Sequence, residues 1–162
     1  GSIDKIKEFD NNIFDIFLAI GDNSIRRTIF EKVKRYNFSF PNLVSKYAIV
    51  DVNSKMGEAN IVCPKVFVGP LSIIGNNNLI NTGAIIEHEA CIKDHCHLSP
   101  LSLVAGRSCI NNECFIGAGA TIIDKISIVK NVIVGAGSTV IRDISSSGTY
   151  AGTPAKLLKL NK

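Results

Sequence analysis

The sequence has no tryptophan, and its aromatic content is only 7%, so its core cannot rest on a few large rings. It has no run of 18 or more apolar residues, so we expect no membrane insertion. It also lacks clusters of lysine and arginine interleaved with aromatic residues, and its net charge is a mild +4, which argues against nucleic acid as a partner. This charge is compatible with a small anionic ligand, such as a nucleotide or a coenzyme. It is equally compatible with a protein that binds no ligand.

The five cysteines are odd in number, and their spacing is unlike that of a secreted disulfide framework. Unpaired thiols are typical of a reducing compartment, so the cytoplasm is predicted. The apolar residues are mostly isoleucine and valine, which favour strands. The length of 162 residues suits one domain, or one domain with a fragment of another.

An aliphatic residue or methionine recurs at every sixth position from residue 50 to residue 140. A helix has a period of 3.6 residues and a strand a period of 2, so neither explains this repeat. A short strand followed by a corner does explain it, with three such units closing one coil of eighteen residues. Successive coils then stack as parallel strands about 4.8 Å apart. The periodic positions are Val50, Met56, Val62, Val68, Ile74, Ile80, Ile86, Ile92, Leu98, Val104, Ile110, Ile116, Ile122, Ile128, Val134 and Val140.

With its recurring glycines and small residues, this pattern resembles the hexapeptide repeat of left-handed parallel β-helices. The resemblance implies the left hand, because parallel crossovers are otherwise right-handed. We therefore expect a mainly β protein with a left-handed parallel β-helix over residues 49–145. Adding eighteen predicts the stacked side chains: His88 under Gly106, Cys91 under Cys109, Cys96 under Cys114, His95 between Asn77 and Glu113, and His97 between Leu79 and Phe115.

Residues 1–48 do not follow the six-residue period. An apolar run at residues 13–20 and the segment 38–44 are predicted to be strands on either side of a helix at 25–36. This is a partial α/β segment of the βαβ kind, the unit that builds nucleotide-binding sheets. It lacks a glycine-rich phosphate loop after an opening strand, so we expect the first strands of such a domain to be missing.

Within the predicted helix, Ile25, Ile29 and Val33 have the spacing of a buried face, and Asn23 or Ser24 is the expected N-cap. At the other end, residues 146–162 leave the period as a loop and cap. Pro154 is predicted to begin a short helix that covers the open last coil, as solenoids require.

All three histidines, His88, His95 and His97, lie within residues 85–100. Histidines near cysteines can hold zinc, and the γ-class carbonic anhydrases bind zinc with three histidines on a β-helix. Those ligands come from different coils and from two subunits. Here the three fall within little more than half a coil, so their side chains leave different faces, and no metal site is expected. Two interpretations of the histidines remain. One is a role in proton transfer, and the simpler one is that a histidine on a β-helix turn is only a solvated surface group.

The stretch NTGAIIEHEACIKDHCHLSP, residues 81–100, resembles the PglD/NeuD-type sugar acetyltransferases. Members of that family acetylate amino or hydroxyl groups of sugars with acetyl-CoA. Their motif has an asparagine, then Ile-Glu-His with an acidic residue, a second histidine nine residues on, and a serine. The matching residues here are Asn81, Ile86, Glu87, His88, Glu89, His97 and Ser99. LAIGDNSIRR (18–27) and GTPAK (152–156) extend the resemblance over most of the chain.

The resemblance implies that His88 is the general base and that Glu89 orients its ring or stabilises its charged form. His95 matches nothing in the motif and is expected to be a bystander. Gly106, one coil above His88, is the candidate backbone donor for the oxyanion. The implied coenzyme-binding residues are His97, Gly106, Gly117, Ala118, Ala136 and Lys156, and the implied substrate-binding residues are Asn81, Gly21, Asp22 and Asn23. Corner packing or helix capping explains many of these equally well.

The sequence therefore predicts an acetyl-CoA-dependent sugar N-acetyltransferase that acts on an amino group of a nucleotide-linked amino sugar of the UDP-4-amino-sugar type. The resemblance also implies a homotrimer with active sites between adjacent protomers. Acetyl-CoA binding is expected to survive the missing glycine-rich loop, whereas the sugar-nucleotide site is expected to be incomplete. The alternatives are O-acetylation of a sugar such as sialic acid, a metal hydratase similar to γ-carbonic anhydrase, and a non-catalytic assembly module.

Overall fold

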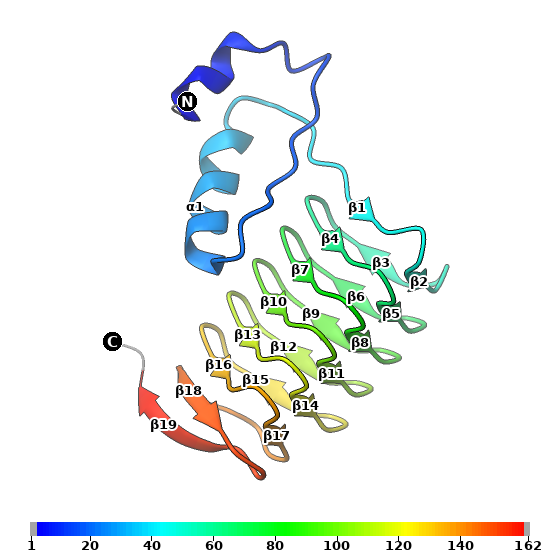
Figure 1. The fold of residues 1–162 in the computed structure, drawn as a ribbon, viewed down its shortest axis with the longest axis vertical. Coiled ribbons are helices and arrows are strands. Elements are labelled where there is room, and N and C mark those ends of the chain that lie inside the picture. Colours follow the sequence, from blue (N-terminus) through cyan, green and yellow to red (C-terminus); the bar gives the residue numbers. More distant parts are fainter. Residues whose placement is uncertain (1–2, 161–162) are drawn as a thin grey trace.

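The computed structural model describes residues 3–160 as a stack of coils with a helical segment at one end and a hairpin at the other (Figure 1). The chain begins with a short 3-10 helix, η1 (Ile3–Glu8), and then forms one α-helix, α1 (Asn23–Lys34). Every later element is a strand. None of the helices in this range is both long enough and apolar enough to cross a membrane.

The strands form the three sides of a parallel β-helix. The first sheet contains β1 (Leu43–Val44), β4 (Ile61–Val62), β7 (Leu79–Ile80), β10 (His97–Leu98), β13 (Phe115–Ile116), β16 (Ile133–Val134), β18 (Gly148–Ala151) and β19 (Lys156–Leu160). The second contains β2 (Ile49–Val50), β5 (Phe67–Val68), β8 (Ile85–Ile86), β11 (Leu103–Val104), β14 (Thr121–Ile122) and β17 (Thr139–Val140). The third contains β3 (Lys55–Met56), β6 (Ile73–Ile74), β9 (Cys91–Ile92), β12 (Cys109–Ile110) and β15 (Ser127–Ile128).

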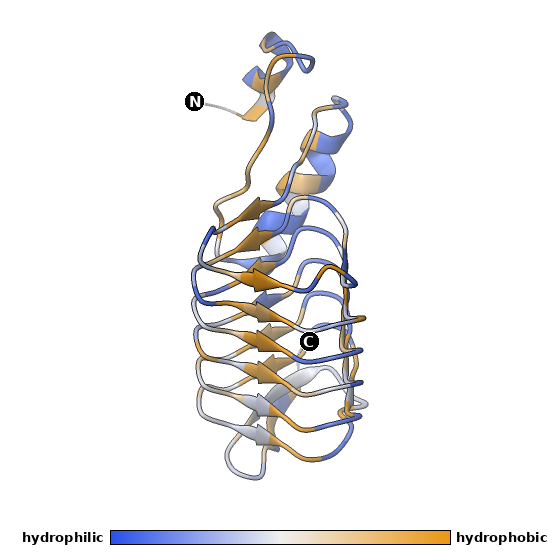
Figure 2. Ribbon diagram, turned by 90° about the vertical axis from the view of Figure 1, so that its right-hand side faces the viewer, coloured by the Kyte–Doolittle hydropathy of each residue, from blue (hydrophilic) through white to orange (hydrophobic). Residues whose placement is uncertain are grey.

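The register between coils is eighteen residues, as the six-residue period predicts. His97 pairs with Leu79 on one side and with Phe115 on the other, and Cys91 pairs with Cys109. From β4 to β17 the second residue of each strand is buried in the core, and Ile92 and Ile110 are 0% exposed. Figure 2 shows the result as stacked hydrophobic strands joined by more hydrophilic corners.

From Met56 to Val134, each corner contains a residue with a positive φ, three positions after the inward-facing aliphatic residue or methionine. Glu89 has φ 58° and His95 has φ 61°, in the left-handed region. Pro70 and Pro100 each stand one position before such a residue. Proline is tolerated there because the ladder of backbone hydrogen bonds takes no amide hydrogen from that position.

Helix α1 begins earlier than predicted, and its N-cap is Asp22 rather than Asn23 or Ser24. The Asp22 carboxylate accepts hydrogen bonds from the Ile25 amide at 2.9 Å and from the Ser24 hydroxyl at 2.7 Å. The N-cap is therefore the carboxylate of Asp22, one residue before the predicted candidates. The Ser24 hydroxyl donates to this carboxylate instead of capping the helix.

The predicted βαβ unit is present only in reduced form. Residues 13–20 are not a strand, but Asp15 forms a single parallel bridge with Ser39 on the far side of the helix. The second predicted strand is β1, which pairs with β4 and so belongs to the coils. The first coil strand therefore begins at residue 43, inside the range assigned from the sequence to the N-terminal segment.

The helix predicted from Pro154 is wrong. The end of the chain forms an antiparallel hairpin in which β18 pairs with β19. Strand β18 itself continues the first sheet by pairing with β16, which leaves its other edge open. Residues 156–160 satisfy the backbone groups of that edge, which a helix would leave without partners.

Candidate active site

The His88 and Glu89 side chains meet at the corner between β8 and β9. Imidazole Nδ1 of His88 lies 3.1 Å from Oε2 of Glu89, and the side chains are 44% and 50% exposed. Glu89 has the left-handed backbone conformation that recurs at these corners. A carboxylate only accepts hydrogen bonds, so Nδ1 carries the hydrogen and Nε2 keeps its lone pair. The pair therefore has the arrangement of a general base with an orienting carboxylate.

Gly106 lies directly against the imidazole of His88, as the eighteen-residue register predicts. A Cβ placed on Gly106 would be 2.6 Å from Nε2 and 2.7 Å from Cε1 of His88. The Arg107 amide donates to the His88 carbonyl oxygen at 3.0 Å and ties the two coils together at this corner. No hydrogen bond of the Gly106 amide occurs within residues 3–160, so this N–H is available to a ligand.

His97 packs between a neighbouring coil and the N-terminal segment. Its ring lies 4.9 Å from that of Phe115, centroid to centroid, and its Nδ1 lies 3.3 Å from the Gly21 carbonyl oxygen. Burial lowers the pKa of His97 below its usual range, so the ring is neutral near pH 7. Its Nε2 is shielded from solvent and has no hydrogen-bond partner in the described part of the chain.

His95 is buried rather than surface-exposed, and it packs against the N-terminal segment. Its Nδ1 accepts from the Asn77 amide nitrogen at 2.8 Å, and its ring meets the ring of Phe30 edge-on at 5.7 Å. Burial lowers its pKa as well. The three histidines therefore contact three different sets of neighbours, and no group of three metal-ligating side chains occurs within residues 3–160.

The residues assigned to the substrate from the sequence, Gly21, Asp22 and Asn23, line a cavity of about 320 Å³ together with Ser24, Glu113, Phe115, Asn131 and Ile133. Two of these side chains are already engaged. The amides of Ile25 and Ser24 and the Ser24 hydroxyl lower the pKa of the Asp22 carboxyl group, which caps α1. The Asn23 side-chain amide donates to the Cys114 carbonyl oxygen at 3.1 Å.

Asn81 is also occupied, because its side-chain oxygen accepts from the Thr82 amide at 2.8 Å. The coenzyme residues fall on two corners. Ala118 and Ala136 are exposed on the corner that follows the first sheet, whereas His88 and Gly106 lie on the corner that follows the second. Gly117 is buried, and a Cβ there would lie 2.5 Å from the Ala136 amide nitrogen, so coil packing alone requires glycine.

Lys156 lines a separate cavity of about 360 Å³ beneath the C-terminal hairpin. Its lining also includes the charged residues Arg142 and Asp143 beside apolar residues such as Val140 and Ile144. One chain thus brings His88, Glu89 and Gly106 together, but it keeps them on a different corner from Ala118 and Ala136.

Arg26 is the residue that the sequence reasoning missed. The expected buried face was Ile25, Ile29 and Val33, but the structure buries Arg26, Phe30 and Val33, and Ile25 is 53% exposed. A charged residue on a helix normally indicates the solvent side, so the residue type of Arg26 argued against its burial. The position of Phe30 one turn later was the available hint.

Several solved structures resemble the chain, whereas no protein-family model matches it. A perosamine N-acetyltransferase from Caulobacter crescentus, with one histidine replaced by asparagine and in complex with CoA and GDP-perosamine, is 33% identical with a TM-score of 0.92. That match covers 95% of this chain and 74% of the other. The acetyltransferase domain of PglB from Neisseria gonorrhoeae, in complex with acetyl coenzyme A, is 31% identical with a TM-score of 0.95, covering 98% and 77%. PerB from Caulobacter crescentus, in complex with CoA and GDP-perosamine, is 37% identical with a TM-score of 0.86, covering 88% and 69%.

The coil geometry and these likenesses define the chain as a left-handed β-helix acyltransferase. Within that class it belongs to the sugar N-acetyltransferase family, which confirms the resemblance seen in residues 81–100.

Proposed function

We propose that this chain transfers the acetyl group of acetyl-CoA to an amino group of a nucleotide-linked amino sugar, with His88 as the general base. The observation that carries this proposal is the His88–Glu89 pair, whose Nδ1–H points to a carboxylate while Nε2 lies against Gly106. The solved relatives with CoA and GDP-perosamine support the same class of substrates.

The chemistry follows from the two ring nitrogens of His88. As the sugar amine attacks the thioester carbonyl carbon, a C–N bond forms and Nε2 takes a proton from the nitrogen. Glu89 stabilises the imidazolium through Nδ1–H. The carbonyl oxygen becomes an oxyanion, for which the Gly106 N–H is the proposed donor. Collapse breaks the C–S bond, and the CoA sulfur leaves as a thiolate that the imidazolium can reprotonate.

The proposed coenzyme groove supports a homotrimer with sites between protomers. Ala118 and Ala136 form an exposed corner of small residues, but His88 stands on another corner of the same chain. A neighbouring copy related by threefold symmetry can bring its own small-residue corner to this His88. Lys156, with Arg142 nearby in the same cavity, is a candidate partner for phosphate groups of the coenzyme. Asn81, whose oxygen is already bonded, is a weaker substrate contact, and His97 would meet the coenzyme through its ring.

A cytoplasmic location is part of the same proposal. The five cysteines are free thiols, as a reducing compartment requires. Acetyl-CoA is also a metabolite that cytoplasmic enzymes can draw on directly.

The experiment is a calorimetric titration of acetyl-CoA together with thiol release in the presence of a nucleotide-linked amino sugar, for wild type and His88→Ala. We expect both proteins to bind acetyl-CoA and only the wild type to release thiol. Failure of a folded wild-type protein to bind acetyl-CoA would overturn the assignment, and full thiol release by the variant would remove His88 from its role.

A further inference from the structure

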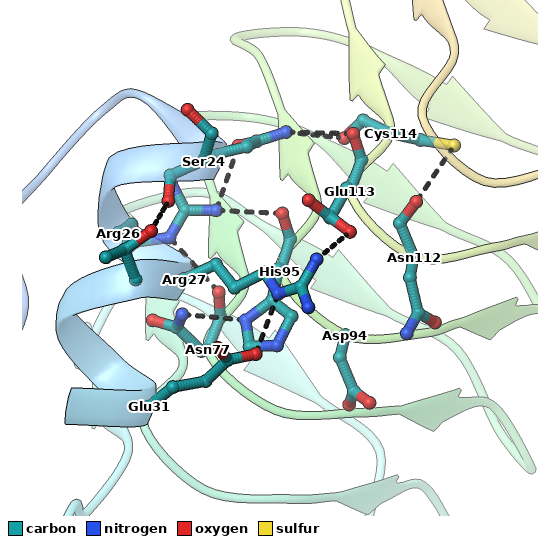
Figure 3. Close-up of polar contacts among 12 residues, drawn as sticks. Ser24, Arg26, Arg27, Glu31, Asn77, Asp94, His95, Asn112, Glu113 and Cys114 are labelled. Atoms are coloured by element: carbon teal, nitrogen blue, oxygen red, sulfur yellow. Dashed lines mark hydrogen bonds and ion pairs between the residues drawn. The ribbon is translucent and has the colours of Figure 1, made fainter. Parts of the chain in front are cut away.

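The first turn of α1 is attached to the coils by one buried cation. The Arg26 side chain is 2% exposed, and it faces carbonyl and amide oxygens rather than a carboxylate (Figure 3). Its acceptors are Asn77 O at 3.1 Å from Nε, Ile20 O at 3.0 Å and Gly21 O at 3.3 Å from Nη1, and Asn23 Oδ1 at 2.9 Å, Cys96 O at 3.0 Å and His95 O at 3.2 Å from Nη2.

These acceptors belong to two different parts of the molecule. Ile20, Gly21 and Asn23 lie in the N-terminal segment, whereas Asn77, His95 and Cys96 lie at the corners of two successive coils. The planar fork of a guanidinium can reach both sets at once, which a lysine ammonium cannot do with its three donors on one atom. Arg26 therefore fixes residues 20–23 relative to the coils.

The Gly21 carbonyl oxygen is held from two sides. Arg26 Nη1 and His97 Nδ1 both lie 3.3 Å from it. Arg26 also binds the carbonyl oxygen of Cys96, the residue just before His97. The position of Gly21 and the hydrogen on His97 Nδ1 are thus linked through Arg26.

We propose that Arg26 is a positioning residue: its guanidinium holds residues 21–23 in the wall of the 320 Å³ cavity and so places the part of the site that receives the nucleotide-linked sugar. The proposal rests on the proposed function, because the cavity matters only if such a sugar is the acceptor. Arg26 itself does not line the cavity, so it acts through Gly21 and Asn23, which do.

The matched control is Lys34, at the opposite end of the same helix. Lys34 pairs with Glu58 of the coils, and both side chains are largely exposed, at 55% and 40%. Lys34→Gln therefore loosens the attachment of α1 without touching residues 20–23. Arg27 is unsuitable for this purpose because it pairs with Glu113, which lines the cavity.

The test compares wild type, Arg26→Gln, Arg26→Lys and Lys34→Gln in steady-state acetyl transfer and in acetyl-CoA binding. A lost hydrogen bond typically weakens an interaction about three- to tenfold, so we expect KM for the nucleotide-linked sugar to rise by at least that factor in both Arg26 variants. Acetyl-CoA should still bind to both Arg26 variants, and Lys34→Gln should match wild type. A lower kcat with unchanged KM, or the same loss in Lys34→Gln, would show a purely structural role and overturn the proposal.

A second readout does not depend on activity. Nitrogen-15 NMR of the histidine rings should show His97 in the Nδ1–H form in wild type and a mixture of both forms in Arg26→Gln. If His97 of the wild type is in the Nε2–H form, its ring does not donate to the Gly21 carbonyl oxygen and the proposal is contradicted. This result holds even if Arg26→Gln proves too unstable to study. If wild type binds no acetyl-CoA, the proposed function fails, while this measurement still decides whether Arg26 positions Gly21.

Discussion

The coils and the N-terminal segment are held together by different kinds of contact. Each coil buries the same aliphatic position, so Ile92, Ile110 and Ile128 are all 0% exposed in one continuous core. The segment instead shares a small separate cluster around Phe30 and Phe40, and its first helical turn contacts the coils through a few polar side chains, of which Arg26 is buried. Repeated contacts make the coils a rigid support, whereas the segment's position depends on a few individual residues.

This difference suggests that the coils and the N-terminal segment have separate roles in catalysis and substrate binding. The proposed base, its carboxylate and the oxyanion donor all stand on coil corners whose register is fixed by the repeat. The proposed sugar-binding wall belongs to the segment. Changes in the coils should therefore affect chemistry or global stability, and changes in the segment should affect substrate binding.

The largest expected effect is the loss of the base. His88→Ala removes a side chain from an exposed corner, so the coils should keep their fold while kcat falls about 10²–10⁴-fold. Circular dichroism and thiol release check the two halves of this prediction. A variant that unfolds would show that this corner also supports the coils, and the separation of chemistry from framework would fail.

The next effect is on the framework itself. Ile110→Ala leaves a cavity in a fully buried position and should cost about 2–5 kcal/mol of the free energy of unfolding. The measurement is denaturant unfolding of the purified protein. Phe30→Ala, in the small cluster, is the comparison: we expect it to release the segment while the coils keep their unfolding midpoint. Equal global unfolding in both variants would contradict the division between the two regions.

A smaller effect tests the contact between neighbouring coils at the site. Gly106→Ala places a Cβ 2.6 Å from His88 Nε2, so the ring must move. A displacement of about 1 Å can cost about 10²-fold in rate, and we expect a loss in kcat of that order. The atoms that a Cβ would meet all belong to the His88 ring.

The control for Gly106→Ala is therefore the double variant with His88→Ala. Gly106→Ala should lower the melting temperature in wild type but hardly change it when the ring is absent. A similar loss in both backgrounds would place the conflict in the backbone rather than at His88.

The same contrast between the coils and the N-terminal segment decides how much of the structure the sequence predicts. The period of six predicts the coils, their register and the stacking of His88 under Gly106, because the same buried aliphatic position recurs in every coil. Residues 81–100 predict the His88–Glu89 pair, since the two residues are adjacent and need no long-range information.

The errors fall where one contact decides the outcome. The buried face of α1 was misassigned because Arg26 is buried by carbonyl oxygens of residues 77, 95 and 96, which no local pattern reveals. The C-terminal helix was wrong because the open edge of β18 recruits residues 156–160 as a strand. The prediction that His95 takes no part in the chemistry stays a prediction, but its burial against Phe30 was not foreseen.

The smallest expected effect concerns pH, and it arises at the boundary between the two regions. Burial lowers the pKa of both His95 and His97 in the folded protein, while the unfolded chain keeps the ordinary value near 6.5. Around His95, Asp94, Glu113 and Glu31 oppose this shift, and Arg27 adds to it. Below about pH 6.5 the unfolded state therefore binds more protons than the folded state, and stability must fall as pH falls.

The free energy of unfolding falls by at most about 1.4 kcal/mol per pH unit for each histidine. This fall ends once the pH drops below the pKa of that histidine in the folded protein. Thermal melts of wild type and His95→Asn between pH 7.5 and about pH 5, a window chosen to lie above the ordinary carboxyl pKa values, check the prediction. We expect the variant to be less stable at pH 7.5 but to lose less on acidification, with exchange of amide hydrogens in α1 rising first in wild type. An equal decline in both proteins would mean that His95 does not couple the segment to the coils, and the acid sensitivity would then have to come from elsewhere in the coils.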